Sequence, residues 1–248
     1  MKSKFSRRKF STTKTKTYPG PFGEQPIFHS LPSRLILIVF CLLLFLNISE
    51  IAIAAQPDEP LVEVSGLDST IIIDMRYASE DNFVKVQLYP VARCLLRKSV
   101  AERLVRVQKR LQALGYGVKV WDAYRPLSVQ KKMWEILPDP RYVAPPERGS
   151  RHNRGAAVDV TLVDSLGHDV EMPTEFDDFS RKAAPTYPHV SETAKKNRQI
   201  LIDAMEAEGF KGISSEWWHY DAPRYRQYPI LDEPLDRVET DSGYKIKN

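Results

Sequence analysis

The strongest constraint on how this chain folds is an acidic residue inside an apolar strand. The segment "AAVDVTL", residues 156–162, alternates between two faces, and Asp159 shares its face with Ala157 and Thr161. Burying an ionised carboxylate is costly unless a cation, hydrogen-bond donors or a metal ion compensates its charge. Asp159 is therefore predicted to bind a metal or to pair with an arginine such as Arg154, and this segment alone leaves both alternatives open.

A second acidic segment favours the metal. It reads "SSEWWHYD" and places Glu216 three residues before His219, while His152 precedes Asp159 in "GSRHNRGAAVDV". Hydrolytic zinc sites commonly use three nitrogen or oxygen ligands and keep one position for water. His152, Asp159 and His219 supply such a set and predict one zinc ion (Zn2+) per chain. Glu216 would then be a carboxylate beside the bound water, where a general base must lie, and a solvated loop acid is the alternative.

Four segments in this order resemble the VanX-type D-alanyl-D-alanine dipeptidases, a branch of the zinc D,D-peptidases (peptidase M15). They are "WDAYRP", "GSRHNRGAAVDVTL", "EFDDF" and "SSEWWHYD", and the resemblance runs from about Ile73 to Tyr220. It implies a zinc D,D-peptidase-like fold and zinc-dependent hydrolysis of D-alanyl-D-alanine to two D-alanines. The nucleophile would be a zinc-bound water and the general base Glu216. The implied partner is therefore a small D,D-dipeptide.

The resemblance also implies a role for each matching residue. Arg125 would stabilise the negative oxygen of the tetrahedral intermediate, which suits a guanidinium that is always charged. Asp177 would face the ammonium group of the substrate, with Asp178 as the nearby alternative. Ser150 and Tyr77 would line the dipeptide pocket. Simpler roles are also compatible with these residues, since Ser150 can bond the turn backbone, Tyr77 can belong to the core, and loop acids are often solvated.

Two other functions use the same residues differently. A zinc D,D-carboxypeptidase acting on peptidoglycan peptides would have the same zinc centre in a more open cleft. A zinc-retaining binding module without catalysis would need neither Glu216 nor Arg125, so their presence argues against it. The motifs alone separate dipeptidase from carboxypeptidase poorly, because the size of the loops decides which substrates enter.

Periodicity predicts strands and helices that do not alternate regularly. The segment "STIIIDMRYAS", residues 69–79, alternates as a half-buried strand, and "YGVKVWDAYRP" reads as a strand that ends at Pro126. A short helix begins at Ser128, and a longer one runs from about Glu192 to Glu208. Together these elements predict an α+β fold with helices packed on a mainly antiparallel sheet.

The longest apolar stripe predicts a helix over residues 99–114. Ser99 and Glu102 have the spacing of a capping box, and Gly115 supplies the stop. The stripe consists of Val100, Leu104, Val107, Leu111 and Leu114.

The N-terminal segment is predicted to direct export. A basic start, an apolar core and small residues ending "AIAAQP" are typical of a secretory signal over residues 1–54, cleaved after Ala54. An uncleaved anchor over residues 35–55 is the alternative. The mature chain, residues 55–248, is expected to be one periplasmic domain with a Pro-rich C-terminal tail and no stable membrane association.

The basic charge of the chain resides in this leader. Residues 1–54 hold eight Lys and Arg against two acids, whereas the remainder holds 28 Lys and Arg against 30 Asp and Glu, a net charge of −2. This balance removes the support for nucleic-acid binding. Cys94, the one cysteine after the leader, is predicted to be a buried thiol, and His168 and His189 are predicted to lie on the surface.

Overall fold

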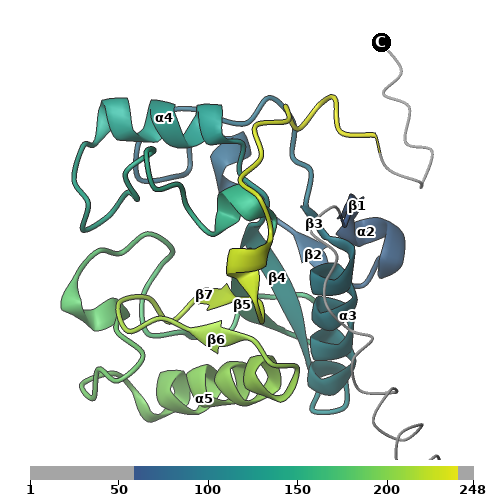
Figure 1. The fold of residues 1–248 in the computed structure, drawn as a ribbon. Helices are drawn as coiled ribbons and strands as arrows, with labels where there is room; N and C mark the ends of the chain where they lie inside the picture. Colours follow the sequence, from purple (N-terminus) through teal and green to yellow (C-terminus); the bar gives the residue numbers. More distant parts are fainter. Residues whose placement is uncertain (1–58, 240–248) are drawn as a thin grey trace, which may run out of the picture. The chain divides into compact units, whose positions relative to one another are not determined.

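The computed structural model describes residues 59–239 and centres on a five-stranded sheet in the order β2-β4-β5-β7-β6 (Figure 1). β4 pairs with β2 in parallel, and the pairs β4–β5, β5–β7 and β7–β6 are antiparallel. The predicted α+β class with a mainly antiparallel sheet is confirmed. The strands are β2 (Ile72–Ile73), β4 (Tyr116–Asp122), β5 (Ala157–Asp164), β6 (Lys211–Gly212) and β7 (His219–Asp221).

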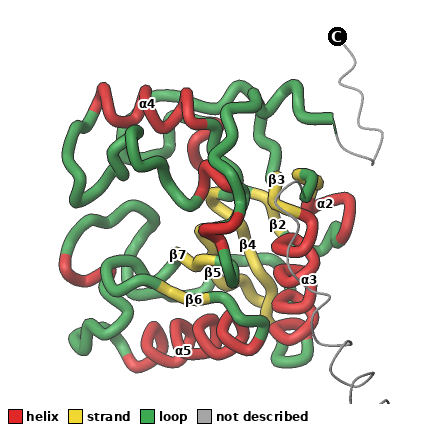
Figure 2. The backbone as a smooth tube through the Cα atoms, in the orientation of Figure 1, coloured by secondary structure: helices red, strands yellow, loops and turns green. Residues whose placement is uncertain are grey.

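Two long helices pack on this sheet and on each other. They are α3 (Lys98–Gln112), which contacts β4, and α5 (Glu192–Ala207), which contacts β5 and β6. A second sheet joins β1 (Leu61–Glu63) to β3 (Leu95–Arg97) next to the short helix α2 (Val64–Leu67). α4 (Leu127–Ile136) lies at the opposite end of the view from α5, and the long loops that follow α4 and precede α5 occupy the side opposite α3 (Figure 2).

α3 shows how the predicted apolar stripe becomes the core. Val100, Leu104, Val107 and Leu111 are fully buried, whereas Leu114 lies beyond the helix end and is 61% exposed. The predicted stop is confirmed, since Gly115 has a φ of +81°, the left-handed conformation typical of a glycine after a helix.

The predicted capping box of α3 is wrong. The helix begins at Lys98, so Ser99 already lies in its first turn, and no side chain caps it from position 97. The carboxylate of Glu59 instead accepts hydrogen bonds from the backbone N–H and the hydroxyl of Ser99. A negative group from outside the helix therefore satisfies one of the unpaired N–H groups of its first turn.

The predicted strand over residues 69–79 is much shorter in the structure. Only Ile72 and Ile73 pair with β4, and a 3₁₀ turn follows at Arg76–Ala78. The predicted alternation holds in part, because Ile71, Met75 and Tyr77 are buried whereas Ile73 is only half-buried, like Ile72 on the other face. Burial of one face thus persists after the backbone has left the sheet.

The predicted leader, residues 1–54, and the alternative anchor, residues 35–55, lie outside the described residues, so export stays a prediction. None of the helices within residues 59–239 has both the length and the apolar composition needed to cross a membrane.

Gly155 is predicted to be essential to the turn that leads into β5. It has a φ of +63°, and a Cβ atom there would lie 2.5 Å from Cδ2 of Leu61, which is itself buried. Gly115 also has a positive φ, but a Cβ atom there would have no other atom within 4 Å. Gly115→Ala should therefore cost about 1–2 kcal/mol of unfolding free energy from the left-handed backbone alone. Gly155→Ala should cost about 1–3 kcal/mol more through overpacking. Urea unfolding of both variants measures the difference, and equal losses would contradict the steric argument.

Candidate metal centre and its cavity

The register of the central strands places three polar residues in one row. Asp159 on β5 lies directly opposite His219 on β7 and directly opposite Asp122 on β4. Residues that face each other across an antiparallel pair share one face of the sheet. All three side chains are buried.

A β-bulge decides that Asp122 belongs to this row. Val120 pairs with Val160, but Asp122 pairs with Asp159, so Trp121 is an extra residue on β4. Without the bulge, Trp121 would lie opposite Asp159. The bulge therefore directs a carboxylate, rather than an indole, toward the polar cluster.

His152 reaches the same cluster from the 3₁₀ turn His152–Arg154 that precedes β5. The turn is held against residues 123–125: His152 Nδ1 lies 2.8 Å from the carbonyl oxygen of Ala123, and the amide of Asn153 donates to the carbonyl of Arg125 at 2.8 Å. A carbonyl oxygen can only accept, so Nδ1 of His152 carries the proton. Its Nε2 lone pair then points toward Asp159 and His219.

His219 is oriented in the same way by a residue on its own strand. Its Nε2 lies 2.9 Å from Oδ1 of Asp221, and an ionised carboxylate accepts, so Nδ1 presents its lone pair to the cluster. His219 Nδ1 is 2.9 Å from Asp159 Oδ1 and 3.2 Å from His152 Nε2. Three electron-pair donors therefore converge, with all ligand atoms within 4.8 Å of one another.

The electrostatics of this cluster show that it needs a positive charge. Burial opposes an imidazolium at His219, but hydrogen bonds to Asp159 and Asp221 outweigh burial and raise the pKa of His219 to about 10. Burial also opposes a carboxylate at Asp159, yet His152 and His219 hold the pKa of Asp159 well below its usual range. Without a metal, a proton supplies the missing charge, and a divalent cation would replace it.

Arg125 lies beside the cluster in a fixed orientation. Its Nε donates to Asp122 at 3.1 Å, a second N–H also reaches Asp122, and Nη1 donates to Gln130 at 2.9 Å. The guanidinium stacks over the ring of Tyr77 at 5.1 Å. Because a guanidinium has five N–H groups and three are used here, two remain for another oxygen.

All eight predicted site residues line one cavity of 230 Å³. This volume is below the roughly 300–1,000 Å³ of pockets for drug-sized ligands, so the cavity fits a small substrate. The eight residues are Tyr77, Arg125, Ser150, His152, Asp159, Asp177, Glu216 and His219.

Two acids in the cavity are held in environments that disfavour their charge. Glu216 is half-buried in the loop before β7, and burial, assisted by Asp159, raises its pKa although His219 opposes the shift. Asp177 has a φ of +58° and accepts a hydrogen bond from the hydroxyl of Tyr77 at 3.1 Å. Burial, with the nearby charge of Asp159, raises the pKa of Asp177 well above its usual range.

Some of the simpler roles considered for the site residues are observed and others are not. Arg154 donates to the carbonyl of Tyr228 and does not pair with Asp159, so that alternative is wrong. Ser150 does bond its turn, accepting from the backbone N–H of His152 at 3.3 Å, and it lines the cavity as well. Tyr77 is both buried and part of the cavity. Asp178 lines a neighbouring cavity instead and accepts from the N–H of Ser180.

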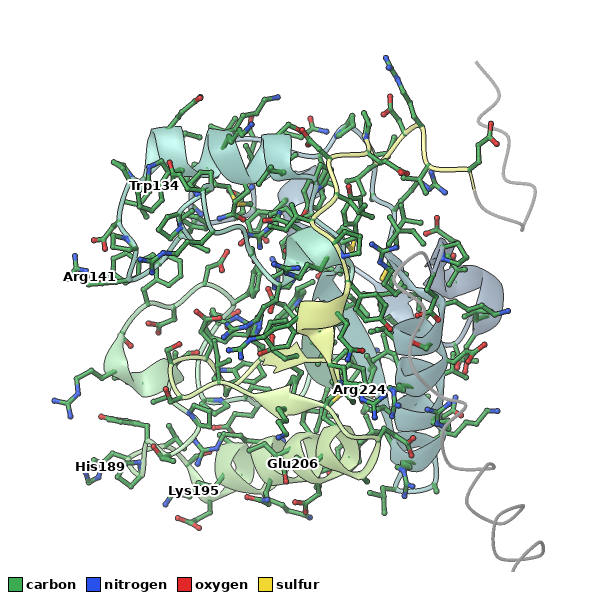
Figure 3. The ribbon with its side chains drawn as sticks, in the orientation of Figure 1. Trp134, Arg141, His189, Lys195, Glu206 and Arg224 are labelled. Atoms are coloured by element: carbon green, nitrogen blue, oxygen red, sulfur yellow. The ribbon has the colours of Figure 1, made fainter. Side chains whose placement is uncertain are left out.

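The residues expected to lie away from the site do so. Cys94 is fully buried, and burial raises the pKa of its thiol well above its usual range. His168 is exposed, and His189 is exposed at the margin of the view in Figure 3.

Three supporting residues were not predicted from the sequence: Asp122, Gln130 and Asp221. Asp221 could have been found, because it lies two residues after His219 and therefore on the same face of the strand. Asp122 stands inside the "WDAYRP" motif, but its position depends on the bulge. Gln130 carries no sequence signal beyond its place on α4.

Comparison with known proteins finds relatives that match most of this chain. A family model described as "Peptidase_M15: D-ala-D-ala dipeptidase" matches residues 58–237. The D-alanyl-D-alanine dipeptidase of Escherichia coli is 37% identical over 171 residues, covering 69% of this chain and 89% of the relative. That of Enterococcus faecalis is 32% identical over 182 residues, covering 65% and 86%. The solved structure "VanYB in complex with D-Alanine-D-Alanine" aligns at 17% identity and a TM-score of 0.37, covering 54% of this chain and 74% of that one.

Proposed function

This chain belongs to the peptidase M15 family of D-alanyl-D-alanine dipeptidases, and on that premise we propose that it hydrolyses D-alanyl-D-alanine with one zinc ion held by His152, Asp159 and His219. The observation that carries the zinc assignment is the convergence of three buried lone-pair donors, one carboxylate and two imidazoles. The other ring nitrogen of each imidazole is already hydrogen-bonded, to Ala123 in the case of His152 and to Asp221 in the case of His219. Nitrogen and carboxylate ligands of this kind suit zinc, and backbone or carboxylate partners commonly orient its histidines.

When bound, zinc supplies a Lewis acid that polarises a peptide carbonyl and lowers the pKa of water. Glu216 has the complementary role of moving a proton. Its carboxylate takes the proton of the attacking water and delivers it to the leaving amine as the peptide C–N bond breaks. A base with a pKa above that of an ordinary glutamate suits this exchange, because it must both accept and release the proton.

Arg125 is proposed to stabilise the carbonyl oxygen as it becomes negative. Asp122 and Gln130 hold the guanidinium in place before the reaction starts, and its two unused N–H groups are available for that oxygen.

The substrate ammonium is proposed to bind at Asp177. No salt bridge of the described residues includes Asp177, so its partly desolvated carboxyl group lacks a cation until a ligand supplies one. Tyr77 holds this carboxyl group by a hydrogen bond, and Ser150 lines the cavity close to His152. A free dipeptide has an ammonium at its first residue, whereas a wall peptide has an amide there.

Export from the cytoplasm is proposed on the leader alone. The mature protein would begin near Ala55 and lie in the periplasm, and sequencing the N-terminus of exported protein distinguishes this from an anchor over residues 35–55.

Each proposed ligand should be required for zinc. Alanine at His152, Asp159 or His219 should remove most of the metal, because only two of the three protein ligands remain. Elemental analysis should find one zinc per wild-type chain and the same in His168→Ala and His189→Ala, the exposed controls. Full zinc content in His152→Ala would refute the ligand set.

Glu216→Gln should retain zinc and fold but lose about 10²-fold to 10⁴-fold in kcat, because the amide cannot accept a proton. Assays of D-alanine release from D-alanyl-D-alanine, alongside zinc content and melting temperature, measure this. A Glu216→Gln variant with the kcat of the wild-type protein would require another base.

Arg125→Lys should also lower kcat although the charge is kept, since an ammonium cannot reproduce the planar fork that meets Asp122 and Gln130.

A dipeptidase should depend on the free ammonium of its substrate. Acetylating D-alanyl-D-alanine should lower kcat/KM by about 10²-fold or more, because Asp177 is left desolvated without a cationic partner. Asp177→Asn should weaken cleavage of the free dipeptide and narrow its advantage over the acetylated one. Comparable kcat/KM for free, acetylated and pentapeptide substrates would instead identify a D,D-carboxypeptidase.

A further inference from the structure

Three loops meet beside the cavity through aromatic side chains. Tyr142, on the loop after α4, stacks on Phe179, on the loop before α5, with ring centroids 4.6 Å apart and planes 29° from parallel. Phe83 packs against the edge of Phe179 at 5.1 Å. All three rings line the catalytic cavity. Figure 1 shows the loop after α4 and the loop before α5 facing each other on one side of the sheet.

A second cavity of 480 Å³ adjoins the first. Its lining includes Tyr187, Arg181 and Thr186, none of which lines the catalytic cavity. Both cavities share Tyr142, Phe179 and Glu216. The stacked pair therefore forms part of the wall between the two cavities, close to the proposed general base.

We propose that the Tyr142–Phe179 stack determines substrate length, by separating the catalytic cavity from the larger neighbouring space. This inference rests on the proposed dipeptidase function and adds a steric element to charge recognition at Asp177. A free dipeptide fits within the catalytic cavity, whereas a peptide with one more N-terminal residue requires space that the two rings occupy. Specificity by exclusion of this kind needs a barrier against the wrong substrate as well as contacts with the right one.

The loops that hold the stack are anchored independently of the two rings. Gln130 donates to the carbonyl of Ala144 at 2.8 Å, and Trp217 donates to the hydroxyl of Thr174 at 2.9 Å. Tyr142 and Phe179 are only half-buried. Truncating either ring should therefore open the wall without removing the contacts that fix the loop backbones. Arg141, next to Tyr142, is exposed on the same loop (Figure 3).

The test compares D-alanyl-D-alanine with glycyl-D-alanyl-D-alanine in the zinc-loaded protein. Tyr142→Ala and Phe179→Ala should each raise the ratio of kcat/KM for the tripeptide over the dipeptide by about tenfold or more. Tyr142→Phe keeps the stacked ring and should keep the low wild-type ratio. Tyr187→Ala is the matched control, because it removes an aromatic ring that lines the neighbouring cavity alone.

The results separate this proposal from the proposed function. If the wild-type protein cleaves the dipeptide and neither truncation changes the ratio, the steric role is refuted while the dipeptidase function stands. A wild-type protein that cleaves both peptides equally also refutes it. If the wild-type protein cleaves neither peptide, the proposed function fails. Equilibrium binding of the same two peptides to the same variants then decides the steric role. A ratio of tripeptide affinity to dipeptide affinity that rises only in Tyr142→Ala and Phe179→Ala supports the steric role. Unchanged ratios refute it.

Discussion

The mutual orientation of Asp159, His152 and His219 is the interaction on which the rest of the site depends. Three lone-pair donors within hydrogen-bonding distance repel one another unless a proton or a metal lies among them, so the surrounding structure must hold them together. The sheet does this for Asp159 and His219 through direct cross-strand pairing. The backbone of Ala123 does it for His152.

The same elements position the other chemical groups. Asp122, brought into the row by the bulge in β4, orients Arg125 and lies 3.5 Å from Nδ1 of His152. Strands and their immediate turns thus supply the groups proposed to bind metal and stabilise charge. Loops supply Asp177, Tyr142 and Phe179, which line the same cavity. Apart from Glu216, which lies in the loop before β7, this division places the proposed chemistry on the rigid part of the fold and the proposed substrate selection on connections that can vary in length.

The features predicted correctly from the sequence were those with a local or periodic cause. The stripe of α3 as far as Leu111 and the burial of Ile71, Met75 and Tyr77 follow from side-chain spacing, and both are observed. The features predicted incorrectly were decided by distant partners. Ser99 bonds Glu59, which lies 40 residues earlier, instead of forming a capping box. The strand at residues 69–79 ends early because only Ile72 and Ile73 find partners on β4.

The sequence by itself determined the kinds of proposed metal ligand and their spacing, because a carboxylate in an apolar strand, a histidine in a polar turn and a histidine three residues after a glutamate are recognisable from neighbouring residues alone. It also contained the motifs that place the chain in its family. Tertiary structure alone decided which nitrogen of each histidine faces the cluster, that Asp122 rather than Trp121 joins it, and that Gln130 holds Arg125. It also decided that Tyr142 meets Phe179. Each of these outcomes depends on contacts between residues from different segments or strands, and no local pattern specifies the distance or direction at which such segments meet.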